Sequence, residues 1–175
     1  FSNRPMNKTK NGQIKYGLHC SKNGWLISDI TIWQIDEDHY LLITGRPQDF
    51  FNLKTLAKLR NNQSVSIKKL DVSTFSVQGP HSLKKLMTVI QNDQLINLKY
   101  FEFIKCTLFG IKVIIGRLGY TGERGFEIIL PSSDNDLVWN KLKKIFKPAG
   151  FSAINCLRIE AGFILFTNEF KIKVT

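Results

Sequence analysis

A short glycine-rich stretch holds most of the side chains in this sequence that could do chemistry. Residues 116–127 read Gly-Arg-Leu-Gly-Tyr-Thr-Gly-Glu-Arg-Gly-Phe-Glu, so a tyrosine, two carboxylates and two arginines alternate with four glycines. Strand interiors disfavour glycine, whereas the flanking residues 111–115 and 126–130 are apolar and typical of strands. We therefore predict a tight loop between two strands that presents polar side chains to a ligand.

The loop does not match the common patterns for phosphate binding or hydrolysis. No Gly-Lys-Ser or Gly-Lys-Thr follows its glycines and no helix is predicted to begin there, although a phosphate-binding loop has both. The Gly-x-Ser-x-Gly elbow of serine hydrolases is also absent. The histidines, His19, His39 and His81, are too dispersed to suggest metal ligation. We therefore expect a ligand site without a metal ion.

A further carboxylate, Asp29, interrupts an apolar stretch that reads Trp25-Leu26-Ile27-Ser28-Asp29-Ile30. A charge among apolar residues costs free energy unless it is paired or used. Two interpretations stay open at this point. Asp29 is either a functional carboxylate or an aspartate on the polar, solvent-facing side of a strand.

The chain is strongly basic, with a formal net charge of +11 and a pI near 9.7. Its lysines are scattered, and pairs such as Lys84-Lys85 and Lys143-Lys144 fall where the apolar pattern predicts surface. A solvated basic face explains this pattern, and a polyanionic partner such as nucleic acid, an acidic carrier protein or a ligand with several carboxylates stays open. Residues 100–105, in which aromatic and charged side chains alternate, are also compatible with a strand that stacks RNA bases.

The elements that must position these side chains form an α+β pattern. At 175 residues and 43% hydrophobic content, the chain is long enough for one domain or one duplicated domain. Strands followed by a helix occur twice, at residues 13–60 and 101–146, which predicts duplicated, ferredoxin-like antiparallel sheet units backed by helices. The predicted strands are residues 13–19, 25–34, 39–44, 65–72, 74–78, 101–108, 111–115, 126–130 and 163–166. Helices are predicted from Arg46-Pro47 to an end at Asn61-Asn62, around residues 83–90 and 133–146, and as a turn at 155–161.

Cellular location is predicted from what the sequence lacks. It has no apolar run of membrane-spanning length, and its first residues lack the apolar middle region of a signal peptide. We therefore expect a cytoplasmic protein, or a mitochondrial matrix protein if the source is eukaryotic. The three widely spaced cysteines, Cys20, Cys106 and Cys156, are predicted to be buried thiols.

Three strings resemble the glycine cleavage T-protein (aminomethyltransferase) family, which includes the folate-binding parts of dimethylglycine and sarcosine dehydrogenases. They are Val-Gln-Gly-Pro at 77–80, Gly-Tyr-Thr-Gly-Glu-Arg-Gly-Phe-Glu-Ile at 119–128 and Leu-Arg-Ile-Glu-Ala-Gly at 157–162. They occur in the order and spacing of that family, and residues 11–13 and 24–32 extend the resemblance upstream. The resemblance implies a tetrahydrofolate-binding domain, with tetrahydrofolate as the acceptor of a one-carbon unit.

The resemblance also implies roles for individual residues. Asp29 matches the aspartate near N5 and N10 of the folate, which assists one-carbon transfer. Glu127 matches the glutamate that grips the pterin ring, and Tyr120 matches a tyrosine that lines the site. Arg117 and Arg124 are candidates to meet the anionic glutamate tail of folate, although solvent exposure explains these arginines equally well.

Departures from the family pattern concern the one-carbon donor. Ile154 stands where the T-protein has an arginine, and Gly45 stands where it has an asparagine. Ser28-Asp29 is closer to the dehydrogenase-associated branch than to the Asp-Asp pair of the T-protein. In the T-protein the donor is an aminomethyl group on the lipoyl arm of a carrier protein, and these departures predict a different methylated amine or a thioether as the donor, or loss of the activity. The alternatives are a non-catalytic folate-binding or assembly-factor relative and a basic nucleic-acid-binding module.

The ends of the chain differ from the family pattern as well. Residues 1–175 are expected to be a folate-binding fragment that lacks upstream strands and the C-terminal barrel domain of the family. Missing strands would leave sheet edges exposed, which predicts self-association or pairing with another chain, such as a fused or associated dehydrogenase.

Overall fold

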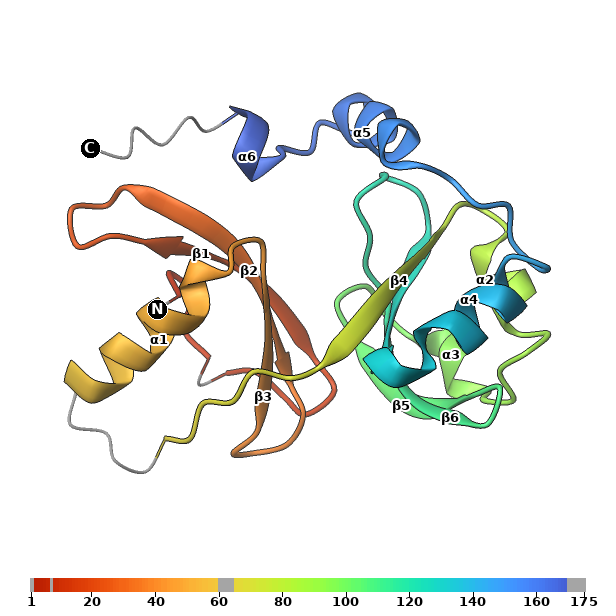
Figure 1. Cartoon of the computed structure of the whole chain (residues 1–175), viewed down its shortest axis with the longest axis horizontal. Coiled ribbons are helices and arrows are strands. Elements are labelled where there is room, and N and C mark those ends of the chain that lie inside the picture. Colours follow the sequence, from red (N-terminus) through yellow and green to blue (C-terminus); the bar gives the residue numbers. More distant parts are fainter. Residues whose placement is uncertain (1, 7, 60–64, 170–175) are drawn as a thin grey trace. The chain divides into compact units, whose positions relative to one another are not determined.

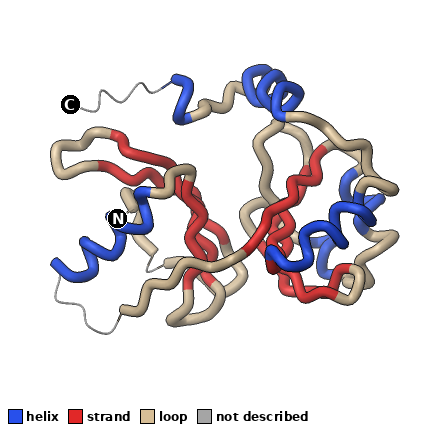
Figure 2. The backbone as a smooth tube through the Cα atoms, in the orientation of Figure 1, coloured by secondary structure: helices blue, strands red, loops and turns tan. Residues whose placement is uncertain are grey.

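The computed structural model describes residues 2–6, 8–59 and 65–169, and these residues form two compact units. The first unit comprises Phe1–Leu70 and Leu165–Thr175, and the second comprises Asp71–Ile164. Both are antiparallel sheets accompanied by helices (Figures 1 and 2). The predicted α+β class with antiparallel sheets is therefore confirmed.

The first unit contains three antiparallel strands, β1 (Ile14–Cys20), β2 (Leu26–Gln34) and β3 (Tyr40–Thr44), in the order β1-β2-β3. Helix α1 (Gln48–Leu59) follows directly, and the short α6 (Phe166–Glu169) belongs to the same unit. Every second residue of β2 from Ser28 to Ile32 is buried, as expected for a sheet with one face against a core. Leu18 of β1 lies opposite Asp29 of β2.

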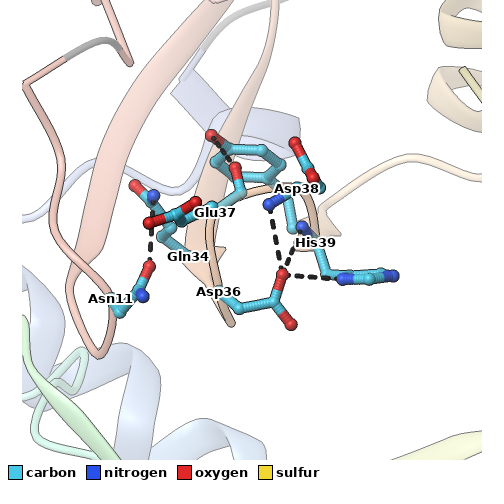
Figure 3. Close-up of polar contacts among 7 residues, drawn as sticks. Asn11, Gln34, Asp36, Glu37, Asp38 and His39 are labelled. Carbon is cyan, nitrogen blue, oxygen red and sulfur yellow. Dashed lines mark hydrogen bonds and ion pairs between the residues drawn. The ribbon is translucent and has the colours of Figure 1, made fainter.

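The turn between β2 and β3 is held by the side chain of Asp36 (Figure 3). Its Oδ1 atom accepts hydrogen bonds from the backbone N–H groups of Asp38 and His39, at 3.1 and 3.0 Å. His39 Nδ1 lies 2.6 Å from the same oxygen, and this contact lowers the pKa of the Asp36 carboxyl. An aspartate that bonds backbone groups two and three residues ahead is a common way to close a turn, so the hairpin follows from local sequence.

The second unit contains a four-stranded antiparallel sheet in the order β4-β7-β6-β5. Its strands are β4 (Val72–Gln78), β5 (Phe103–Leu108), β6 (Ile111–Gly116) and β7 (Gly125–Pro131). Its helices are α2 (Ser82–Leu86), α3 (Gln94–Asn97), the 3₁₀ turn η1 (Ser132–Asp134), α4 (Asn135–Leu142) and α5 (Phe151–Glu160). The chain therefore forms β5, β6 and β7 in succession and joins β7 to the earlier strand β4.

The core of the second unit lies on one face of this sheet. Phe126 and Ile128 of β7 are completely buried, together with Leu86 of α2 and Val138 of α4. Because successive residues of a strand point to opposite faces, Glu127 is directed to the face opposite this core. Glu127 thus lies on the face of β7 that it shares with Ile129, which is also buried.

Two predicted strands are wrong. Residues 65–71 form no strand, and β4 begins only at Val72. Val65 and Leu70 are 49% and 56% exposed. A segment forms a strand only where a neighbouring strand accepts its hydrogen bonds, and the described residues supply none here. Residues 163–165 are irregular and α6 begins at Phe166, so the predicted strand 163–166 is wrong for the same reason.

The start of one helix and the exposure of two cysteines also differ from the predictions. Helix α5 begins at Phe151, earlier than the predicted turn at 155–161. The predicted helix end at Asn61-Asn62 lies outside the described residues. Cys20 and Cys156 are exposed, so the expectation of buried thiols is wrong for them, whereas Cys106 is partly buried. None of the helices in the described ranges is long and apolar enough to cross a membrane.

Candidate functional site

The glycine loop, residues 116–127, contains the connection from β6 to β7 and the first residues of β7, as its composition predicted. The three sequence strings that mark the chain meet at this loop. Gln78, the last residue of β4, bonds to the carbonyls of Leu118 and Phe126 on the two arms of the loop. Gly122 lies at the loop tip with φ +74°, and a Cβ added there would come within 2.7 Å of the Ala161 side chain. The loop therefore needs glycine at this point for backbone conformation and for contact with the end of α5.

Tyr120 fastens the loop to the segment after α5. Its hydroxyl donates a hydrogen bond to the carbonyl of Ile164, and its ring stacks on Phe163 with centroids 5.6 Å apart and planes 11° from parallel. Arg158 of α5 is buried and donates from Nη1 to the Phe163 carbonyl at 3.0 Å. Tyr120 thus has a structural contact in addition to the ligand contact predicted for it, which stays a prediction.

Glu127 lies on β7 directly opposite Ser76 of β4 and Gly116 of β6. Burial raises the pKa of the Glu127 carboxyl above its usual value. Within the part of the chain that the structure describes, no side chain or backbone group hydrogen-bonds to this carboxylate or pairs with it. A desolvated carboxylate with both oxygens unengaged is costly, and a ligand that donates hydrogen bonds would offset that cost.

Arg117 lies at the start of the loop and is partly engaged within the protein. Its Nη1 donates to the Leu98 carbonyl at 2.8 Å, and its backbone N–H bonds to the Glu102 carbonyl at 2.8 Å. These contacts tie the loop entry to the turn before β5. A guanidinium has five N–H donors, so this bond leaves capacity for a second partner.

Asp29 is half-buried on the face of β2 opposite Ser28 and Ile30. The hydroxyl of Tyr16 donates a hydrogen bond to Asp29 Oδ2 at 3.2 Å. On the other side, a Cβ added at Gly45 would lie 3.5 Å from Asp29 Oδ1, an ordinary van der Waals distance. The absence of a side chain at Gly45 therefore leaves room beside Oδ1, while Tyr16 holds Oδ2.

Sequence reasoning missed Tyr16, although strand register could have revealed it. Leu18 is opposite Asp29, and Tyr16 lies two residues further along the same face of β1. Such diagonal neighbours are within reach of a long aromatic side chain. The pairing of β1 with β2 was predictable, but its register was needed to bring these two side chains together.

A second polar group in the first unit also escaped sequence reasoning. Asp49 of α1 accepts a hydrogen bond from Ser28 Oγ at 2.7 Å, and its other oxygen lies 3.0 Å from His19 Nδ1. All three residues are buried, with 4%, 0% and 1% exposure for His19, Ser28 and Asp49. The aspartate lies between the serine and the histidine, whereas a nucleophile triad places the histidine in the centre. We therefore assign these residues to holding α1 on the sheet.

The four predicted site residues are divided between the two units. Asp29 belongs to the first unit, and Arg117, Tyr120 and Glu127 belong to the second, within or next to the glycine loop. The structure thus brings three of the four together on one connection. Among the described residues, no three histidine, cysteine or acidic side chains cluster in a way that could hold a metal ion.

Comparison with protein families now places the chain. The model of the GCVT N-terminal domain matches residues 1–175. The chain belongs to the glycine cleavage T-protein family. Within this family it is 30% identical to an aminomethyltransferase of Thermoanaerobacter pseudethanolicus, over 97% of the chain and 48% of that protein. It is 32% identical to an aminomethyltransferase of Thermosipho melanesiensis, over 95% of the chain and 47% of that protein.

A solved member of the T-protein family has the same fold. The glycine cleavage system aminomethyltransferase T from Bartonella henselae superposes with a TM-score of 0.77 and 25% sequence identity, over 90% of this chain and 43% of that one. The chain spans about half the length of the aminomethyltransferases it matches.

Proposed function

We propose that this chain binds tetrahydrofolate and takes part in the transfer of a one-carbon unit to it. The observation that carries the proposal is Glu127, a largely buried carboxylate beside the glycine loop that no group in the described part of the chain engages. Membership of the T-protein family and the names of its aminomethyltransferase relatives support the choice of ligand.

The geometry of a carboxylate suits the pterin ring of folate. A pterin presents an exocyclic amino group beside a ring N–H, so two donors point in parallel. The two oxygens of Glu127 can accept them as a fork, and such charge-assisted pairs are roughly twice as strong as neutral hydrogen bonds. The same bonds would offset the burial that raises the pKa of the Glu127 carboxyl.

Asp29 is the proposed chemical carboxylate. A carboxylate beside N5 and N10 of the folate can accept the protons that these nitrogens lose and can stabilise a developing iminium cation. The hydrogen bond from Tyr16 engages Oδ2 of Asp29 and keeps the carboxylate in one orientation. Oδ1, beside Gly45, is then the oxygen proposed to accept the protons.

The proposed donor is an aminomethyl group carried as a thioether on the lipoyl arm of a carrier protein. The methylene carbon loses its bonds to nitrogen and sulfur and gains bonds to N5 and N10 of the folate. The two protons released from these nitrogens go to the leaving amine and thiolate, so the products are methylene-tetrahydrofolate, ammonia and the free thiol. No electrons are gained or lost overall, so the reaction needs no oxidant.

Charge supports an acidic partner for this chain. Its formal charge of +11 would favour association with an acidic lipoyl carrier protein or dehydrogenase through complementary potentials.

Arg117 is proposed to meet the glutamate tail of folate with the guanidinium donors that do not bond to Leu98. We place the protein in the cytoplasm, or in the mitochondrial matrix of a eukaryotic source.

Calorimetric titration with tetrahydrofolate under anaerobic conditions tests the site. Loss of a forked, charge-assisted pair in Glu127→Gln should weaken binding by about 10- to 100-fold. Glu123 is an exposed glutamate on the same loop, so Glu123→Gln is the matched control and should leave the affinity unchanged. Absence of binding by the unmodified chain, or equal affinities of the two variants, would contradict the proposal.

A transfer assay separates an enzyme from a folate-binding relative. The chain is incubated with tetrahydrofolate and either an aminomethylated lipoyl carrier or a methylated amine, and methylene-tetrahydrofolate is measured. If the unmodified chain forms methylene-tetrahydrofolate and Asp29→Asn does not, the result supports catalysis. Folate binding without product from any donor would assign the chain to the non-catalytic alternative. Salt-sensitive RNA binding without folate binding would favour the nucleic-acid alternative.

A further inference from the structure

Gln78, the last residue of β4, contacts the glycine loop at three points. Its Nε2 group lies 3.3 Å from the carbonyl of Leu118 on the entry arm and 3.3 Å from the carbonyl of Phe126 on the exit arm. The same amide bonds to Ser76 Oγ at 3.0 Å, and Thr121 Oγ1 donates to Gln78 Oε1 at 3.5 Å. One side chain therefore bridges both arms and the tip of the loop.

The position of the Gln78 amide explains why two positions of the loop are glycine, whereas their backbone conformations do not require glycine. Gly119 and Gly125 do not have φ angles in the left-handed region, so their conformations are open to any residue. A Cβ added at either position, however, would overlap the carboxamide of Gln78. These glycines thus leave the space in which Gln78 lies.

The residues that follow Gln78 reinforce the same attachment. The backbone N–H of Gly79 donates to the carbonyl of Arg124 at 2.9 Å, and Ser82 Oγ donates to the same oxygen at 3.0 Å. Gly79 has φ +110°, a conformation that favours glycine, so this close approach depends on the residue type. The Val-Gln-Gly-Pro string is therefore built around the exit of the loop.

We infer that Gln78 is the positioning residue of the folate site, because it holds the glycine loop in the shape in which Glu127 receives the pterin ring. The carbonyl of Phe126 belongs to the peptide unit that leads into Glu127, so Gln78 acts one bond away from the proposed pterin contact. The role inferred for Gln78 is therefore exerted through the loop. The inference rests on the proposed function for the identity of the ligand.

The first experiment replaces the amide by an apolar group of similar volume. Gln78→Met is compared with Gln91→Met, which makes the same change at an exposed position of the same unit. An arginine-specific protease reports on the loop, because Arg117 and Arg124 lie within it. Gln78→Met should speed cleavage at these two arginines and weaken tetrahydrofolate binding by about tenfold, with the urea midpoint close to that of the Gln91→Met control.

A compensating pair distinguishes positioning from general support of the fold. Gly125→Ala alone should weaken binding, because its Cβ displaces the Gln78 amide. In a Gln78→Ala background the alanine has room, so the double variant should bind no more weakly than Gln78→Ala does. Additive losses in the double variant would overturn the inference, because they would show that the two positions act independently.

The possible failures have separate signatures. An unmodified chain that binds no tetrahydrofolate refutes the proposed function and, with it, the folate-site role of Gln78. If the unmodified chain binds and Gln78→Met binds equally well, the proposed function stands and the positioning role is overturned. The positioning role would also be overturned if Gln78→Met lowered both tetrahydrofolate binding and the urea midpoint without faster cleavage of the loop.

Discussion

Replacing Asp49 by alanine should destabilise the first unit much more than removing the exposed His39–Asp36 pair. The His19–Asp49 pair is buried, with side chains 5% and 1% exposed, whereas the side chains of the His39–Asp36 pair are 76% and 51% exposed. The chemical groups are the same. The two pairs therefore compare the same chemical groups at a buried and at an exposed position, with Asp49 also accepting the Ser28 hydroxyl.

The expected magnitude follows from the partners of Asp49. Its carboxylate receives the Ser28 hydroxyl at 2.7 Å and lies 3.0 Å from His19 Nδ1, both inside the unit. Removing a hydrogen-bond partner from a buried polar group typically costs about 1–3 kcal/mol, because that group stays desolvated, and here two groups, the Ser28 hydroxyl and the His19 ring, lose a partner. With a urea dependence of about 1–3 kcal/mol per molar, the unfolding midpoint should fall by about 1 M or more.

Tryptophan fluorescence during urea unfolding provides the assay. Trp33 of β2 is completely buried in the first unit, so its emission reports on this unit, whereas Trp25 is 75% exposed. Ser28→Ala removes only one of the two contacts and should give a smaller decrease than Asp49→Ala. Solvent competes effectively at exposed pairs, so His39→Ala should leave the midpoint near that of the unmodified chain. Equal midpoints for Asp49→Ala and His39→Ala would refute the reasoning.

Further predictions concern the glycine loop, a thiol and Glu127. Gly122→Ala should lower stability by more than Gly162→Ala. Both glycines have left-handed φ angles (+74° and +76°), which cost about 1–2 kcal/mol for alanine, but only at Gly122 would the added Cβ meet a neighbouring carbon. Equal urea midpoints for the two variants would contradict this prediction. Burial raises the pKa of Cys106 to about 11, so a thiol reagent at pH 8 should modify exposed Cys20 well before Cys106, as mass spectrometry of timed samples would show. The pKa of Glu127 is raised on folding, so the folded chain binds more protons above the usual carboxyl pKa of 4.5 and its stability should fall as pH rises through the raised pKa. Glu127→Gln should remove this slope in urea unfolding at several pH values, while folate binding by the unmodified chain should strengthen over the same range because the ionised form accepts the pterin donors.

Local sequence determined much of the architecture. Short runs of apolar residues, alternating or consecutive, predicted the strands that became β1 to β3 and β5 to β7, because a strand that packs on a core needs apolar side chains on at least one face. The spacing of glycines predicted a loop between β6 and β7, because glycine weakens strands and favours tight connections. The family strings predicted the T-protein family itself, which the family comparison confirmed.

Only the tertiary structure decided which segments pair as strands and which side chains pack together. Residues 65–71 contain apolar residues typical of a strand but have no described neighbour to pair with, so the local prediction was wrong. Phe163 was predicted to begin a strand and instead stacks on Tyr120, a residue 43 positions earlier in the chain. Such contacts depend on which surfaces the fold brings together, and the local pattern of polarity does not contain that information.

The candidate site was likewise predicted in part from sequence and decided in part by the tertiary structure. Sequence alone identified Asp29 and Glu127 as carboxylates next to apolar strands, together with Tyr120 and Arg117 in the loop. Only the folded chain showed that Glu127 is desolvated without a described partner, that Tyr16 bonds to Asp29 and that Gln78 occupies the space left by two loop glycines. Residue types and spacing are written in the sequence, whereas burial and hydrogen bonding arise when distant segments pack, and these decide what a polar side chain can do.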